Sequence, residues 1–277
     1  MPKLPSSLVA LSFESSLLST FLKGSSFAAL PLSTKDVDIP YFVQKKIGNH
    51  YLLLMAEGGS DYNHAVTALT AKSLWGPYVP CTINPVLTHR HLGKDSPVQS
   101  LGHADLVQTP TGDWYAVFLG KRIVEGGLVP LGRETFLCEV SFQNGEPIFN
   151  PGIGVIGNRL KRPLLPWTPV SKTDKQNDFE SSALSPEWAT MRIPEQPLHH
   201  FADGNLFLSL RPEMADSLVC PSMLLHRVHS HNFSAITTMT FSTCQANEWA
   251  GLVLYRTAKG YYSLLKGKNE IRLTIDK

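Results

Sequence analysis

The chain lacks the features that mark several large classes of protein. Its 277 residues contain no run of eighteen apolar residues, which argues against a transmembrane helix. The formal net charge is only +2, so composition gives no reason to expect a nucleic acid or an anionic membrane as partner. Hydrophobic residues make up 43% of the chain and charged residues 17%, which is typical of a globular protein and not of a disordered one.

Cysteine is scarce, and the four cysteines lie far apart at Cys81, Cys138, Cys220 and Cys244. None forms a C-x-x-C pair, the spacing that would indicate a zinc or redox site. A disulfide between Cys220 and Cys244 stays open. The "THRH" stretch offers His89 and His91 at alternating spacing, but no third ligand at a suitable spacing follows except His103, so zinc has little support.

The N-terminal stretch "MPKLPSSLVALSFESSLLSTFLKGSS" follows the pattern of a secretory signal peptide only in part. Pro5 and Glu14 interrupt its apolar stretch, and no A-x-A-like cleavage site follows cleanly. A secretion signal and a disordered leader over residues 1–36 both stay open. The compartment, cytoplasmic or secreted, is therefore not assigned.

β-Strand patterns dominate the rest of the first half, and no amphipathic helix pattern follows the leader. The runs "NHYLLLMAEGG" at 49–59 and "HAVTALTAKS" at 64–73 predict a strand and its returning partner. The same order comes back in "GDWYAVFLG" at 112–120 and "RETFLCEVSF" at 133–142. A repeat of this length made of hairpins is typical of successive propeller blades, although many β-sandwiches also repeat hairpins.

The composition changes near residue 160, where a stretch rich in Pro, Lys and Ser predicts a linker over 161–178. Short strands at close spacing then predict an antiparallel sandwich. The expected strands are 205–210, 222–228, 234–242, 250–257, 260–267 and 270–275.

One histidine stands out in "LGHADLVQTPTGDWYAVFLGKR", residues 101–122. His103 lies between Gly102 and Ala104, just ahead of a predicted strand and a Gly-Asp turn. Its ring either hydrogen-bonds a turn, or the two small neighbours clear space so that it can face a ligand. Composition does not decide between these interpretations.

Several motifs in order resemble glycoside hydrolase family 43, in its β-xylosidase and α-L-arabinofuranosidase branch. They are "AEGGSDYNHAVTALTAKSLWGPY", "NPVLTHRHLG", "GHADLVQTPTGDWYAVFLG" and "LGRETFLCEV". Later, "SMLLHRVHSHNFSAITTMTF" and "AGLVLYRTAKGYYSLL" resemble the concanavalin-like sandwich that follows the propeller in that branch. The resemblance implies an all-β fold, with a partial five-bladed β-propeller over 37–160 and a partial concanavalin-like β-sandwich over 179–277.

The chemistry that the resemblance implies is inverting hydrolysis, in which an acid and a base carboxyl group stand roughly 6.5–9.5 Å apart. The family's base and a further tuning Asp belong to blades that precede the recognisable part of this chain. In "VDIPYFVQ", Asp38 takes the place of the family's acid, a Glu, and Tyr41 replaces a His. Asp38 is either a low-efficiency stand-in for the acid or a solvated loop residue.

The resemblance assigns two substrate-binding residues. His103 falls on the family's Gly-His-Ala histidine, which orients water, substrate or a bound cation near the propeller axis. Arg133 falls on Gly-Arg-Glu-Thr, whose fixed guanidinium fork suits paired sugar hydroxyls; the alternative is a surface pair with Glu134. No cofactor is required, and the metal that the resemblance allows is Ca²⁺ in the propeller channel, held near His103 through water.

Two classes of function remain. The first is a glycoside hydrolase for O-glycosyl bonds of xylo- or arabino-oligosaccharides, impaired because the base-bearing blades are missing. The second is a non-catalytic remnant or carbohydrate-binding module. Neither involves nucleic acid or membrane. Missing blades would expose sheet faces that favour oligomers, and a truncated gene model accounts for the same features.

Overall fold

The computed structural model describes residues 42–169, 177–181 and 183–276. The chain divides into two compact units, Met1–Pro166 and Trp167–Lys277. In the described ranges the regular structure consists of strands and short 3₁₀ turns, among them η2 (Arg90–Leu92) and η3 (Glu125–Gly127), so the fold is all-β. None of the helices described there is long and apolar enough to cross a bilayer. The leader at 1–36 and Asp38 lie outside the described residues.

The first blade is an antiparallel sheet that follows chain order. Strands β1 (Phe42–Ile47), β2 (His50–Glu57) and β3 (Ala65–Ala71) pair in sequence. Two short strands share the fourth position, because β4 (Val79–Pro80) pairs with the end of β3 and β5 (Leu87–Thr88) pairs with its start. The strand pair predicted at 49–59 and 64–73 is thus present as β2 and β3.

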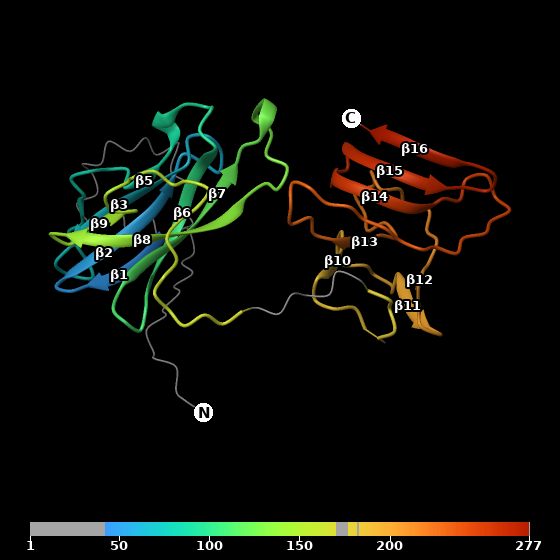
Figure 1. Ribbon diagram of the computed structural model, residues 1–277, viewed down its shortest axis with the longest axis horizontal. Coiled ribbons are helices and arrows are strands. Elements are labelled where there is room, and N and C mark those ends of the chain that lie inside the picture. The colour runs from blue at the N-terminus through green and yellow to red at the C-terminus, as the bar shows by residue number, and fades with distance from the viewer. Residues whose placement is uncertain (1–41, 170–176, 182, 277) are drawn as a thin grey trace. The chain divides into compact units, whose positions relative to one another are not determined.

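The second blade has the same topology. Strands β6 (Val98–Gln108), β7 (Trp114–Arg122), β8 (Glu134–Gln143) and β9 (Glu146–Phe149) form a meander in chain order. Its middle strands β7 and β8 correspond to β2 and β3, which confirms the repeat predicted from the sequence. In Figure 1 this green blade lies against the blue first blade.

The two blades bury one face each in a common core. Alternation along a strand sends every second side chain to the same face, and on these faces that side chain is apolar. The largest fully buried members include Leu52, Leu54 and Val66 from the first blade and Leu101, Leu106 and Phe118 from the second. This packing holds the end of β2 and the start of β3 next to β6, where the candidate site lies.

The second unit consists of three small sheets. Strand β10 (Trp188–Thr190) pairs with β13 (Leu224–His226), and β11 (His199–Ala202) pairs with β12 (Asn205–Leu208). Strands β14 (Ala250–Thr257), β15 (Gly260–Lys266) and β16 (Ile271–Asp276) form a three-stranded antiparallel sheet. The three last predicted strands are confirmed.

One predicted strand is wrong. Residues 234–242, "SAITTMTFS", carry no regular secondary structure. The run is rich in Thr and other residues that favour a pleated surface, but such a preference takes effect only where a neighbouring strand supplies hydrogen bonds and packing. No described strand pairs with this segment.

Candidate functional site

An open pocket of about 400 Å³ lies over strands β6, β7 and β8 of the second blade. Three neighbouring strands or their ends contribute its walls. It is lined by His103, Asp105, Leu106, Val107, Val117, Phe118, Leu119, Arg133 and Thr135. The two residues that the resemblance assigns to substrate binding, 30 positions apart in the chain, therefore line one pocket.

Strand β6 reaches this pocket through two consecutive β-bulges. Its register against β7 shifts between Gln99 and Gly102 and again between Gly102 and Asp105. Ser100 and His103 have φ values of 56° and 57°, in the left-handed region that non-glycine residues rarely adopt. Bulges and such backbone strain concentrate at functional sites, where they redirect side chains. The sequence placed His103 ahead of a strand; it lies inside one, at a bulge.

Gly102 and Ala104, the small neighbours of His103, are required by packing inside the protein and do not create space for the ring of His103. A Cβ on Gly102 would lie 2.3 Å from the imidazole of His64, so only glycine fits beneath that ring. Ala104 is buried in the core between the blades. His103 itself is exposed toward the pocket while both neighbours are buried. The idea that these two residues clear space for His103 is therefore replaced by a packing reason.

His64 is the residue that the sequence reasoning missed. It directly precedes β3, is 3% exposed, and its Nδ1 donates to the backbone carbonyl of Ser100 at 3.2 Å. Its own main chain is held by bonds from its N–H to the carbonyl of Asp61 (2.9 Å) and from Thr88 Oγ1 to its carbonyl (3.1 Å). A histidine at a strand start gives no signal by itself that it packs beneath another blade.

Burial lowers the pKa of His64, and the nearby His103, Lys121 and Arg133 lower it further, against the opposing effect of the Ser100 bond. The pKa of His103 is also lowered, first by burial and then by the Arg133 guanidinium. Both rings are therefore neutral near pH 7. A neutral imidazole offers one donor and one acceptor, which suits sugar hydroxyls or water.

Ion pairs fix the carboxylates around the pocket. Glu57 pairs with Arg90 at 3.0 Å and also accepts a hydrogen bond from Thr67 Oγ1 at 2.6 Å. Across the blades, Asp61 pairs with Lys121 at 3.2 Å. Neither carboxylate is among the residues that line the pocket.

The alternative role for Arg133 was a surface ion pair with Glu134. Its carboxylate pairs with Arg122 of β7 at 3.3 Å, and among the ion pairs of the described residues none joins it to Arg133. The exposed Arg133 side chain instead lines the pocket with His103. Such a guanidinium can offer its planar fork to a ligand.

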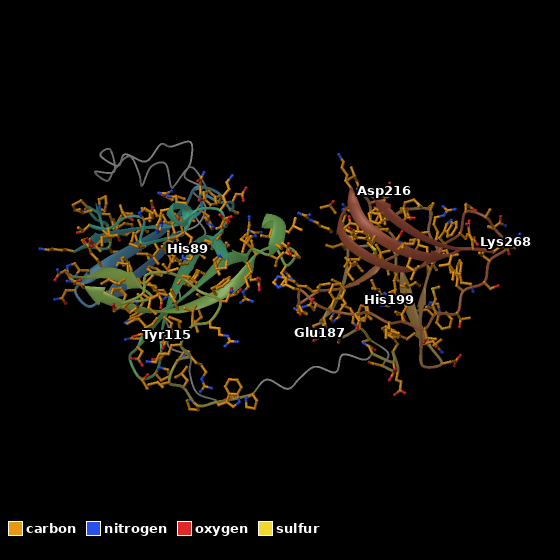
Figure 2. All side chains as sticks on the ribbon, turned by 45° about the horizontal axis from the view of Figure 1, so that its top comes forward. His89, Tyr115, Glu187, His199, Asp216 and Lys268 are labelled. Carbon is orange, nitrogen blue, oxygen red and sulfur yellow. The ribbon has the colours of Figure 1, made fainter. Side chains whose placement is uncertain are left out.

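His89 has a purely structural arrangement. It is 1% exposed, and Figure 2 shows it inside the first unit. Its Nδ1 donates to the carbonyl of Val98 at 2.7 Å, and its Nε2 accepts from the N–H of Ile156 at 3.0 Å. Both ring nitrogens are occupied by the main chain, which leaves none to bind a metal ion.

The described residues do not assemble a calcium site by themselves. Ca²⁺ takes six to eight oxygen ligands, several of them carboxylates. Asp105 is the single carboxylate among the residues lining the pocket, and it pairs with Lys45 at 3.4 Å. No group of three His, Cys, Asp or Glu side chains in the described ranges could hold a metal ion. The calcium expectation stays a prediction.

Two family models match consecutive parts of the chain. Residues 33–147 match the model described as "Glycosyl hydrolases family 43", and residues 176–275 match "Beta xylosidase C-terminal Concanavalin A-like domain". The order of the two matches is the order of the two units.

Individual proteins of known activity or structure are similar to this chain along most of its length. A "Xylosidase/arabinosidase" of Butyrivibrio fibrisolvens is 36% identical over 91% of this chain and 50% of that protein. A "Non-reducing end alpha-L-arabinofuranosidase" of Bacteroides ovatus is 34% identical over 89% of this chain and 46% of its own length. The solved structure of a xylan beta-1,4-xylosidase from Bacillus halodurans aligns with a TM-score of 0.73 at 27% identity, over 84% of this chain and 46% of that one.

The chain thus spans about half the length of the curated relatives it matches. Its blades and its second unit match the two domains of these proteins in the same order, and the chain belongs to glycosyl hydrolases family 43.

Proposed function

We propose that the pocket on β6, β7 and β8 binds the pentose end of xylo- or arabino-oligosaccharides through His103 and Arg133. The relatives, a xylosidase/arabinosidase and an arabinofuranosidase, indicate the substrate class. The observation that carries the proposal is the convergence of the bulged His103 and of Arg133 in one pocket.

The lining of the pocket suits a sugar. Binding sites of small ligands combine an apolar wall with a few placed polar groups. Here Val107, Val117 and Leu119 provide the apolar wall. His103 offers a neutral ring, and Arg133 offers donors in a fixed fork for neighbouring hydroxyls.

Hydrolysis by this chain is expected to be impaired. Inversion needs two carboxyl groups on opposite sides of the bond that breaks. The described lining supplies one, Asp105, which pairs with Lys45. Glu57 and Glu134 are held in ion pairs with arginines. Because one general acid or base typically contributes about 10²–10⁴ in rate, the described site supports binding better than turnover.

Calorimetric titration with xylobiose and with an arabino-oligosaccharide tests the binding. We expect His103→Ala and Arg133→Ala each to weaken binding about tenfold or more, because each substitution removes the hydrogen bonds of one ring or guanidinium to the sugar. Arg159→Ala is the matched control, since Arg159 is exposed in the same unit and does not line the pocket. Unchanged affinity in both pocket variants would refute the proposal.

The same preparations decide between a hydrolase and a binding module. We expect no measurable turnover of p-nitrophenyl xyloside or p-nitrophenyl arabinofuranoside. Turnover that Asp38→Ala abolishes would instead establish Asp38 as the acid and contradict the impairment.

A further inference from the structure

We infer that His64 is a positioning residue, which holds the double bulge of β6 and thereby directs His103 into the pocket. This deepens the proposed function and rests on it for the binding readout. His64 comes from the first blade, whereas the bulges and His103 belong to the second. The pocket of one blade would then depend on a side chain of the other.

The contacts of His64 fall on the first bulge and on the residue that links it to the second. Its Nδ1 bonds the carbonyl of Ser100, the first residue with a positive φ. A carbonyl oxygen can only accept, so the proton of the neutral ring is on Nδ1. The ring then lies against the Cα of Gly102, at the point where a Cβ would lie 2.3 Å away. His103, the second residue with a positive φ, follows directly.

Two adjacent non-glycine bulges need external support. A left-handed conformation at Ser100 or His103 is disfavoured, and it persists where the surroundings determine it. His64 provides a hydrogen bond to one bulge and a flat surface against the link to the next. Its main chain is held by hydrogen bonds to Asp61 and Thr88, so the ring extends from a fixed point of the backbone.

His89 separates this role from an ordinary structural one. It is equally buried and also bonds the main chain of β6. Its partners are Val98, ahead of the first bulge, and Ile156, beyond β9. Loss of either histidine should destabilise the first unit, but only loss of His64 should move His103.

The test compares His64→Phe, which keeps a flat ring without the donor, with His64→Asn, whose amide nitrogen takes the place of Nδ1. His89→Phe is the matched control. Each full-length variant is titrated with xylobiose, and the imidazole nitrogens of His64 and His103 are recorded by NMR. We expect about tenfold weaker binding and shifted His103 resonances in His64→Phe, with recovery to within about threefold in His64→Asn. His89→Phe should leave both readouts unchanged in the folded protein.

A second variant covers the case in which His64→Phe does not fold. Gly102→Ala pushes the ring of His64 away from the strand and should shift the resonances of His103 in the same direction. Unshifted His103 resonances in Gly102→Ala and in every folded His64 variant would overturn the inference. If the wild type binds no pentoside, the proposed function fails. The His64 tautomer, with its proton on Nδ1, and the response of His103 then still decide the positioning role.

Discussion

The two units of this chain differ in whether their apolar sheet faces are covered. In the first, two antiparallel blades cover each other, and side chains such as Leu52 and Phe118 are fully buried between them. In the second, apolar residues line up in rows across the β14–β16 sheet and stay exposed. One row is Leu252, Leu264 and Leu273, and the next is Leu254, Tyr262 and Ile275.

The difference shows what a β-sheet needs to become a stable layer. A sheet with one apolar face gains stability when a second layer covers that face. The blades meet this condition within the described residues, and their contact also builds the site, because it brings His64 under β6. The face of β14–β16 has the same alternating pattern without a described layer over these rows.

The largest expected effect comes from truncating one leucine in each unit. Leu52→Ala, at a position that is 0% exposed, should lower the free energy of unfolding of the first unit by about 2–5 kcal/mol through the cavity that it leaves. Leu273→Ala, at 69% exposure, should change the second unit by about 0.5 kcal/mol or less. Urea unfolding followed by hydrogen exchange on peptides of each unit measures both. Equal losses of unfolding free energy in the two variants would contradict the difference in burial between the two units.

A smaller effect is expected from acid. Burial lowers the pKa values of His64 and His89 in the folded state, whereas an unfolded histidine titrates near 6.5. As the pH falls below about 6.5, the unfolded chain therefore takes up protons first, and the first unit loses stability. The loss is bounded by about 1.4 kcal/mol per pH unit for each histidine.

Unfolding of the first unit at pH 7.5, 6.5 and 5.5 measures this dependence. The variant His89→Phe removes one histidine whose pKa is lowered by burial, so its stability should depend less steeply on pH than that of the wild type. A first unit that gains stability on acidification would contradict the assignment of two neutral buried rings.

The smallest effect concerns the exposed rows. Leu264 is the central residue of its row on β15, and Leu264→Lys should weaken dye binding and self-association without changing the melting temperature. The matched control is Val79→Lys, at an exposed apolar position of the first unit. Light scattering after size exclusion compares the two. If self-association falls equally in both variants, the exposed rows of the β14–β16 face are not its main cause.

Much of the fold could be predicted from the sequence because it depends on local patterns. The middle strands of both blades, β2, β3, β7 and β8, follow from alternating apolar residues and turn residues, and the repeat shows that they form similar units. Residues 234–242 fail for the converse reason: their composition favours a strand, but a strand needs a partner that composition does not specify.

The site could be predicted only in part. The resemblance selected His103 and Arg133, and both line the pocket. The reason for Gly102 could not be found in the sequence, because the ring that excludes a Cβ there belongs to His64, in the other blade. Likewise, the partner of Glu134 is Arg122 on the neighbouring strand, and not the adjacent Arg133. Contacts between strands and blades depend on register and packing, which spacing along the chain does not reveal.

The most direct test of the central claim is a map of backbone amide shifts during titration of the full chain with xylobiose. We predict that the perturbed amides cluster around His103 on β6, around Val117 on β7 and at Arg133, and that the amides of β14–β16 do not respond. Perturbations confined to the second unit would place sugar binding on the sandwich and contradict the account, as would the absence of any response in the first unit.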